Sequence, residues 1–148
     1  MNTLQIDNIL NDKCKDHFLG VFAKDTLPTS LPQQRPLLLV CNTDVKSRPG
    51  SHWIAMYIDK TAEYFDSFGE KPHKEFEQFM NRHCTSWTFN LRQLQSLVSY
   101  YCGQYCIFYC LYKCIGYDMN RILKCFTNDT GVNDWLVHKF VCRLIKKV

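Results

Sequence analysis

Hydrophobic residues recur first at helical spacing and then in strand-like runs in the first third of the chain. Apolar positions three to four residues apart predict a short helix near the start, with Asn2 or Thr3 as its cap. These apolar positions are Leu4, Ile6, Ile9 and Leu10. A proline-punctuated loop follows, and the unbroken apolar run 37–41 after it predicts a fully buried strand. A turn is predicted at 48–50.

Two strand-like segments, 52–58 and 62–68, predict a β-hairpin. Side chains alternate between the faces of a strand, so His52 and Asp66 share a face if residues 59–61 form the connection. The two residues are then diagonal neighbours, roughly 7–8 Å apart at the backbone, which their side chains can span. A two-residue connection would shift the parity and separate them, so the pairing depends on this loop.

The remaining pattern is mainly helical. The expected elements are helices at 72–83, 102–114, 118–125 and 132–146 and a strand at 86–89. The segment 102–114 is apolar almost all round, which is typical of a helix in the interior. A chain of 148 residues is the size of one domain with a real core. We therefore expect a single α+β domain, residues 1–148, with helices on both sides of a mixed central β-sheet.

Composition narrows the class of protein. Hydrophobic residues make up 46% of the chain, but no apolar run reaches the roughly eighteen residues that a membrane-spanning helix needs. The first residues lack a basic segment leading into an apolar one, so we expect no secretory signal. These features predict an intracellular protein without membrane association.

Nine cysteines are a high number for this length. Four of them, at 102, 106, 110 and 114, are spaced along one predicted helix, where neighbouring turns rarely give good disulfide geometry. We interpret Cys106, Cys110 and Cys114 as small buried apolar residues in a reducing compartment. A zinc site is the alternative, but the chain has no CxxC pair and no matching His spacing, so no metal is expected.

The net charge of +4 comes from 18 basic and 14 acidic residues. Basic residues gather at a few places along the chain: Lys13, Lys15, Lys24, Lys46, Arg48, Arg143, Lys146 and Lys147. An ordinary solvated surface accounts for this charge. The alternative is a weak, non-specific and salt-sensitive affinity for DNA.

Four dispersed residues carry the functional groups of a cysteine hydrolase. In chain order they supply an imidazole, a carboxylate, an amide and a thiol: His52, Asp66, Gln95 and Cys102. A papain-like enzyme places its Cys first, so this order indicates another class. Each residue alone is more often structural, and the interpretation depends on the four together.

Cys102 is the candidate nucleophile because it begins the predicted buried helix. The positive end of that helix and a neighbouring His52 imidazolium would both lower the pKa of its thiol. Asp66 would orient His52 and stabilise its charge. Gln95, through its side-chain amide, and Cys102, through its backbone N–H, would donate to the oxyanion. Gly103 leaves the backbone open to a close substrate.

At these residues the chain resembles adenain, the adenovirus-type maturation protease. The resemblance rests on Gly50-Ser51-His52-Trp53, Tyr64-Phe65-Asp66-Ser67-Phe68-Gly69, Gln95 and Tyr101-Cys102-Gly103-Gln104-Tyr105-Cys106. Segments 17–20 and 41–43 are also similar, so the resemblance covers most of the chain. The His-Trp and Cys-Gly pairs are shared with the wider clan of SUMO proteases, whereas the seven-residue interval from Gln95 to Cys102 is closer to adenain.

The chain also departs from the family pattern at two places. Its acid is Asp66, where adenovirus enzymes carry Glu, so the backbone must approach His52 more closely. The part after Cys102 is shorter, so the resemblance does not extend to substrate or DNA contacts made there. Shortened relatives occur in small DNA viruses and in virus-like elements of the Polinton type.

The resemblance implies a cysteine endopeptidase that cleaves capsid or core precursors after small residues, Gly above all, during virion maturation. A narrow slot over Trp53 and Gly103 would then bind the substrate. It further implies a short capsid-derived activating peptide, held by a disulfide to Cys84, which precedes Gln95 by the family's interval of eleven residues. DNA would act as a surface cofactor. We expect a monomer located in the host nucleus and the virion.

Two alternatives to this function remain open. One is a protease that removes ubiquitin or SUMO modifiers, which belongs to the same clan and also cuts after Gly-Gly. The other is a catalytically inactive relative that binds capsid or DNA.

Overall fold

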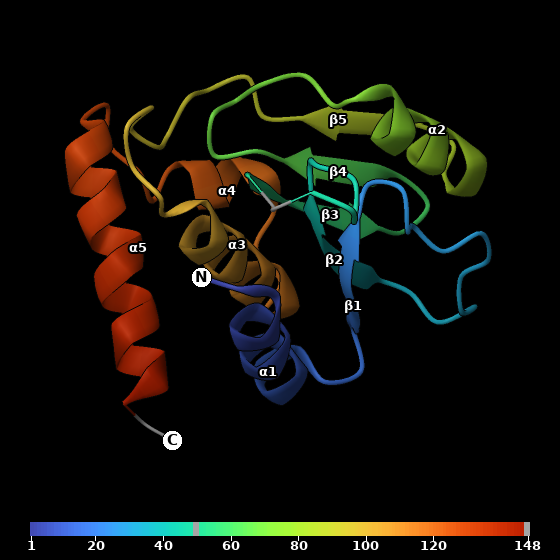
Figure 1. Cartoon of the computed structure of the whole chain (residues 1–148), viewed down its shortest axis with the longest axis horizontal. Coiled ribbons are helices and arrows are strands. Elements are labelled where there is room, and N and C mark those ends of the chain that lie inside the picture. The colour runs from blue at the N-terminus through green and yellow to red at the C-terminus, as the bar shows by residue number, and fades with distance from the viewer. Residues whose placement is uncertain (49–50, 147–148) are drawn as a thin grey trace.

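A computed structural model describes residues 1–48 and 51–146. At its centre is a five-stranded sheet whose strands lie in chain order from one edge to the other (Figure 1). The strands are β1 (Phe18–Ala23), β2 (Leu37–Asn42), β3 (Trp53–Ile58), β4 (Ala62–Phe65) and β5 (Trp87–Phe89). The central three pair antiparallel and each edge strand pairs parallel with its neighbour, so the sheet is mixed.

Helices cover both faces of this sheet (Figure 1). They are α1 (Thr3–Cys14), α2 (Lys74–His83), α3 (Cys102–Cys114), α4 (Met119–Leu123) and α5 (Thr130–Ile145). One hydrophobic cluster joins α1, α3, α4 and α5 to one face, and a second joins α2 to the other. The expected α+β architecture, with helices on both sides of a mixed sheet, is therefore confirmed. In the described residues, no helix is long and apolar enough to cross a bilayer.

The strand β2 lies between these two clusters and is buried along its whole length. Leu38 and Val40 belong to the cluster around α3, whereas Leu39 and Cys41 belong to the cluster around α2. An unbroken apolar run is the pattern of a strand covered on both faces. The buried strand expected at 37–41 is thus confirmed.

Among the helices of the described residues, α3 is the most enclosed. It packs on β3, between α1 and α5, and its first turns are buried from Cys102 to Cys110 apart from the half-buried Gln104. A helix that is apolar on all sides has to be covered on all sides. This enclosure fixes where its first residue, Cys102, lies.

The hairpin has the connection on which the sequence argument depended. Ile58 pairs with Ala62, so residues 59–61 connect the strands as expected. Both strands are shorter than predicted, since β3 begins after His52 and β4 ends before Asp66. An additional strand, β1, was not predicted; it is a half-buried edge strand interrupted by Gly20. The turn expected at 48–50 falls partly outside the described residues.

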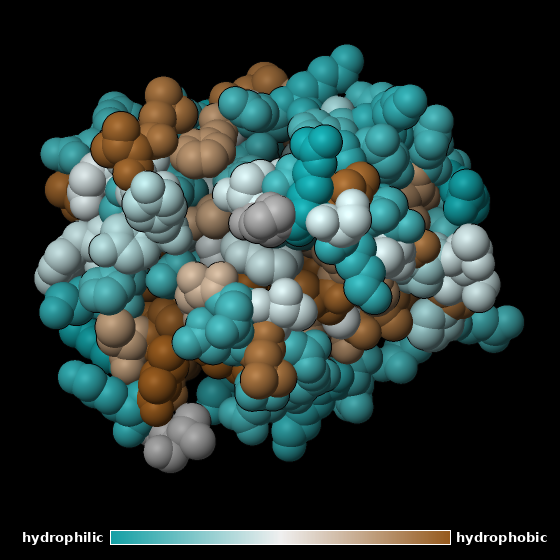
Figure 2. Space-filling view, in the orientation of Figure 1, coloured by the Kyte–Doolittle hydropathy of each residue, from teal (hydrophilic) through white to brown (hydrophobic). Residues whose placement is uncertain are grey.

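The segment between β5 and α3 exposes several hydrophobic side chains, which gather at the upper left of Figure 2. The exposed apolar residues of this segment are Leu91, Leu97, Val98 and Tyr100. Its interior side is nevertheless ordered, because Leu94 and Gln95 donate their backbone N–H groups to the carbonyl of Ser67. The segment is therefore anchored to the loop that follows β4.

Gly69 closes that loop at a position where a side chain has no room. Its φ is +70°, and its N–H donates to the carbonyl of Asp66 at 2.8 Å. A Cβ here would lie 2.8 Å from the carbonyl carbon of Arg92 and 2.9 Å from the oxygen of Leu91. Gly116, after α3, has a φ of +98°, but apart from its chain neighbours no atom of the described residues lies within 4 Å of such a Cβ. A side chain at Gly116 would meet only backbone strain from the positive φ, whereas one at Gly69 would meet both strain and steric overlap.

We expect Gly116→Ala to lower the free energy of unfolding by about 1–2 kcal/mol, because only the positive φ is penalised. Gly69→Ala should cost a further ~1–3 kcal/mol, since the backbone of Leu91 and Arg92 must also move. Urea denaturation measures both losses, provided that the variants share the same slope of unfolding free energy against urea concentration. Equal losses in the two variants would show that the close approach at Gly69 has no energetic effect.

Candidate active site

Three of the predicted site residues lie at the ends of three different elements. His52 directly precedes β3, Asp66 directly follows β4, and Cys102 begins α3. Because β3 and β4 are antiparallel, the start of one lies beside the end of the other. The helix α3 packs on β3, and its first residue reaches the same end of the sheet. The fold thus brings an imidazole, a carboxylate and a thiol together.

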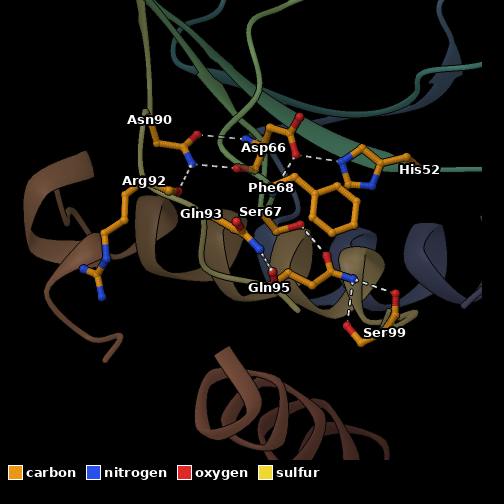
Figure 3. Close-up of polar contacts among 9 residues, drawn as sticks. All are labelled: His52, Asp66, Ser67, Phe68, Asn90, Arg92, Gln93, Gln95 and Ser99. Atoms are coloured by element: carbon orange, nitrogen blue, oxygen red, sulfur yellow. Dashed lines mark hydrogen bonds and ion pairs between the residues drawn. The ribbon is translucent and has the colours of Figure 1, made fainter. Parts of the chain in front are cut away.

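His52 and Asp66 form a short, protected hydrogen bond (Figure 3). Nε2 of His52 lies 2.7 Å from Oδ1 of Asp66, and the side chain of Asp66 is buried. The ring of Phe68 stacks on the imidazole at 4.5 Å, and its backbone N–H donates to the same Oδ1 at 2.8 Å. The carboxylate therefore holds the imidazole in one orientation, with Nδ1 as the ring nitrogen left for another partner.

Asn90, which the sequence analysis missed, holds the backbone of Asp66 (Figure 3). Its Oδ1 accepts the N–H of Asp66 at 2.9 Å and its Nδ2 donates to the carbonyl of Asp66 at 2.6 Å. The side chain thereby replaces the strand neighbour that Asp66 lacks beyond the end of β4. An Asn after a short strand is typical of an ordinary turn, so nothing in the neighbouring sequence indicated that Asn90 holds Asp66.

Cys102 has the electrostatic environment of a reactive thiol. Burial raises the pKa of Cys102, but the hydrogen bond to His52, backbone hydrogen bonds to Trp53 and Gly103 and the charge of His52 outweigh it, and the pKa lies below its ordinary value. Within the described part of the chain no side chain caps the N-terminus of α3, so the N–H groups of its first turn add positive potential. These factors favour a thiolate.

The pKa of His52 shifts in the opposite direction, upward. Burial lowers the pKa of His52, but hydrogen bonds to Asp66 and Cys102, together with the charges of both partners, raise it to about 9. Nε2 is occupied by Asp66, which leaves Nδ1 as the ring nitrogen for the thiol. A low thiol pKa beside a high imidazole pKa favours a thiolate–imidazolium pair at neutral pH.

Gln95 is present at the site but its amide is already engaged (Figure 3). The side chain is fully buried. Its Oε1 accepts the hydroxyl of Ser67 at 2.6 Å, and its Nε2 donates to the carbonyl and the hydroxyl of Ser99 at 3.1 and 3.0 Å. Gln95 thus ties the residue after Asp66 to the segment that leads into Cys102. The oxyanion role stays a prediction, and it requires Nε2 to leave Ser99.

Trp53 and Gly103 lie side by side, but Gly103 is inside the protein. A Cβ on Gly103 would lie 3.2 Å from Cβ of Met1, 3.4 Å from Cδ1 of Ile6 and 3.5 Å from Cδ1 of Trp53. Gly103 therefore allows α1 and Trp53 to pack closely on α3, and its role in substrate binding stays a prediction. The indole N–H of Trp53 donates to the carbonyl of Met1 at 3.3 Å.

The other cysteines of α3 differ from Cys102. Cys106 and Cys110 are buried, and burial raises the pKa of both thiols well above the ordinary value. Cys114 is half-buried rather than enclosed, and a hydrogen bond with Cys14 lowers the pKa of its thiol against the opposing effect of burial. All nine thiols are free. Across residues 1–48 and 51–146, no group of three or more His, Cys, Asp or Glu side chains is placed to hold a metal ion.

No protein-family model and no curated protein sequence matches the chain. Solved structures do share its fold. A crystal structure of the ASFV pS273R protease matches with a TM-score of 0.66 and 17% identity, over 90% of this chain and 64% of that one. A selenomethionine crystal structure of the same protease gives a TM-score of 0.60 at 18% identity, over 93% and 66%.

A third solved structure is the central domain of the uncharacterized Lpg1148 protein from Legionella pneumophila. It matches with a TM-score of 0.55 and 15% identity, over 97% of this chain and 98% of that one. The chain spans slightly less than two thirds of the ASFV protease, at 64% and 66% in the two structures. At these identities the likeness establishes a shared fold, and the ASFV protease is one of the proteins that have it.

We expect the imidazole of His52 to titrate near pH 9 rather than near 6.5, and iodoacetamide to alkylate Cys102 below the pH range of an ordinary thiol. NMR of the His52 ring and alkylation rates measure the two. Since the folded-state pKa of His52 exceeds its unfolded value of 6.5, its contribution to stability is full below pH 6.5 and is lost as pH rises through about 9.

Asp66→Asn is the control for this titration. It keeps the shape of the side chain and removes the charge, so the midpoint of His52 should fall. A wild-type midpoint at or below 6.5 would contradict the ion pair.

Proposed function

We propose that the chain is a cysteine endopeptidase with Cys102 as nucleophile, His52 as acid and base, and Asp66 as the group that orients His52. The observation that carries this proposal is the 2.7 Å hydrogen bond from His52 to the buried Asp66, with the same imidazole against a thiol at the start of α3. The fold shared with the ASFV pS273R protease supports a protease-like function.

The proposed reaction proceeds in two halves. The Cys102 thiolate attacks the scissile carbonyl carbon, and the negative charge moves to the carbonyl oxygen. The His52 imidazolium then gives its Nδ1 proton to the leaving amine as the C–N bond breaks, which leaves a thioester on Cys102. Neutral His52 next takes a proton from water, the resulting hydroxide attacks the thioester, and collapse releases the carboxylic product and the thiolate.

The oxyanion of each half-reaction needs hydrogen-bond donors placed in advance. The backbone N–H of Cys102, in the uncapped first turn of α3, is one proposed donor. The Gln95 amide is the other. In the structure the hydrogen bonds to Ser99 hold this amide, so substrate binding would have to release one of its N–H groups.

As substrates we propose capsid or core precursors of a virus or virus-like element, cut after small residues, Gly above all. The resemblance to adenain and the fold shared with the ASFV protease support this choice. DNA as a surface cofactor is supported only by the net charge of +4. A monomer acting in the host nucleus and the virion completes the proposal.

Cys84 is the proposed attachment point of an activating peptide. It follows the last turn of α2, close in sequence to the edge strand β5, where a peptide strand could add. The thiol is half-buried and lies 3.5 Å from the carbonyl of Asp59. Burial raises the pKa of Cys84, although Arg35 opposes the shift, so disulfide exchange there would be slower than at an ordinary exposed thiol.

We expect Cys102→Ala to abolish cleavage of capsid precursor proteins with Gly-Gly sites, by about 10⁴-fold or more. Cys106→Ala, a buried thiol one turn later in α3, is the matched control and should keep the activity. Cleavage is followed by gel and mass spectrometry. Undiminished cleavage by Cys102→Ala would remove it from the nucleophile role.

The same proteins distinguish the two alternatives. Turnover of ubiquitin or SUMO C-terminal fluorogenic conjugates, without precursor cleavage, would point to a modifier protease. Absence of selective iodoacetamide labelling at Cys102 would point to an inactive binding protein.

We expect Gln95→Ala to lower kcat about 100- to 1,000-fold with little change in KM, because one oxyanion donor is lost. Ser99→Ala removes one acceptor of the Gln95 amide and leaves the amide in place. It should therefore keep kcat near the wild-type value. Equal losses in both variants would instead assign Gln95 to holding the segment before Cys102.

A further inference from the structure

A pocket of about 450 Å³ lies at the same end of the sheet as His52, on the side of β1. Its walls come from the start of α1, the ends of β1 and β2, the segment 44–48 and the side chain of Trp53. Phe22, Val45 and Trp53 give it apolar surface, and several polar side chains share the lining. The mechanism proposed above makes no use of this pocket.

Asn42, one of the residues that line the pocket, carries an unpartnered buried donor. The residue is only 5% exposed. Its Oδ1 accepts the backbone N–H of Asp44 at 2.9 Å, which fixes the orientation of the amide. Its Nδ2 has no hydrogen-bond partner in the described part of the chain. Buried donors are nearly always paired in native proteins because an unpaired one is costly, so a ligand oxygen would complete this group.

The charge of the lining favours an anionic oxygen. Lys46 and Arg48 line the pocket, opposed by one carboxylate, that of Asp44. Within residues 1–48 and 51–146, neither cation takes part in a salt bridge. The backbone N–H of Lys46 donates to Asp25 at 2.8 Å, which orders this segment while leaving the ammonium group available.

Trp53 connects the pocket with the nucleophile. Its backbone hydrogen-bonds to Cys102, while its side chain packs at Gly103 and also lines the pocket. One residue therefore touches both places. An extended polypeptide advances about 3.3–3.6 Å per residue, so a chain whose carbonyl lies at Cys102 reaches past an indole within roughly two to four residues.

We propose that this pocket is a specificity subsite that takes an Asp or Glu side chain of the polypeptide substrate, two to four residues from the scissile bond. The proposal rests on the endopeptidase function proposed above. Nδ2 of Asn42 donates to one carboxylate oxygen, and Lys46 and Arg48 supply the opposite charge. The indole of Trp53 packs against the stem of the bound side chain.

The test uses internally quenched peptides with a central Gly-Gly, in which each of the four positions on either side is Glu, Gln or Leu. At one position wild-type protein should cleave the Glu peptide about 10- to 100-fold faster than its Gln isostere, the usual gain from a charged hydrogen bond. Asn42→Asp keeps the acceptor for Asp44 and turns the donor into a carboxylate, so it should prefer Gln.

Two lysine variants give a matched pair. Lys46→Glu should lose the preference for Glu, and because Lys46 is exposed this variant tests the proposal even if Asn42→Asp does not fold. Lys60→Glu makes the same change in the connection between β3 and β4, at the opposite end of the sheet, and should keep the preference. A preference that survives both Asn42→Asp and Lys46→Glu would overturn the subsite.

Binding to the Cys102→Ala protein separates this proposal from the proposed function. Fluorescence anisotropy of the same peptides should give a lower Kd for Glu than for Gln, and the difference should vanish when Lys46→Glu is added. If the variants bind in this way but the wild-type protein, with Cys102 intact, cleaves none of the peptides, the subsite would be supported and the proposed endopeptidase function would be overturned. Cleavage with no position favouring Glu would overturn the subsite alone, and neither binding nor cleavage of any peptide would overturn both.

Discussion

The enclosure of α3 is the constraint on which the rest of this structure depends. A helix that is apolar almost all round cannot remain at a surface, so β3, α1 and α5 must pack around it. Its N-terminus then has to emerge at one end of the sheet. That end is where an antiparallel pair places the residue before β3 and the residue after β4. The position of Cys102 relative to His52 and Asp66 is therefore a consequence of core packing.

The sequence contained enough information for this much of the site. Alternation along two short strands and a three-residue connection predicted that His52 and Asp66 would meet. In the structure Nε2 of His52 lies 2.7 Å from Oδ1 of Asp66. The strong helical and apolar character of 102–114 predicted the buried helix. Both inferences use spacings inside one element or one hairpin, where local geometry leaves few choices.

What the sequence could not supply are contacts between distant segments. Asn90 bonds to the backbone of Asp66 across 24 residues, and Gln95 bonds to Ser67 across 28. Nothing within a few positions of either residue distinguishes it from an ordinary loop amide. The close packing around Gly103 was not foreseen for the same reason, because the neighbours that fill its surroundings come from Met1, α1 and β3. β1 was missed because its burial is partial and its pattern is broken by Gly20.

The thiolate favoured at Cys102 has a chemical consequence beyond peptide cleavage. Oxidants attack thiolates far more readily than thiols. The thiols of Cys106 and Cys110, one and two turns further along the same helix, are kept protonated by burial. Peroxide would therefore convert Cys102 to a sulfenic acid before it touched these neighbours. The arrangement that activates the nucleophile also makes it more prone to oxidative inactivation than Cys106 and Cys110, and a reducing environment becomes a working requirement of the site.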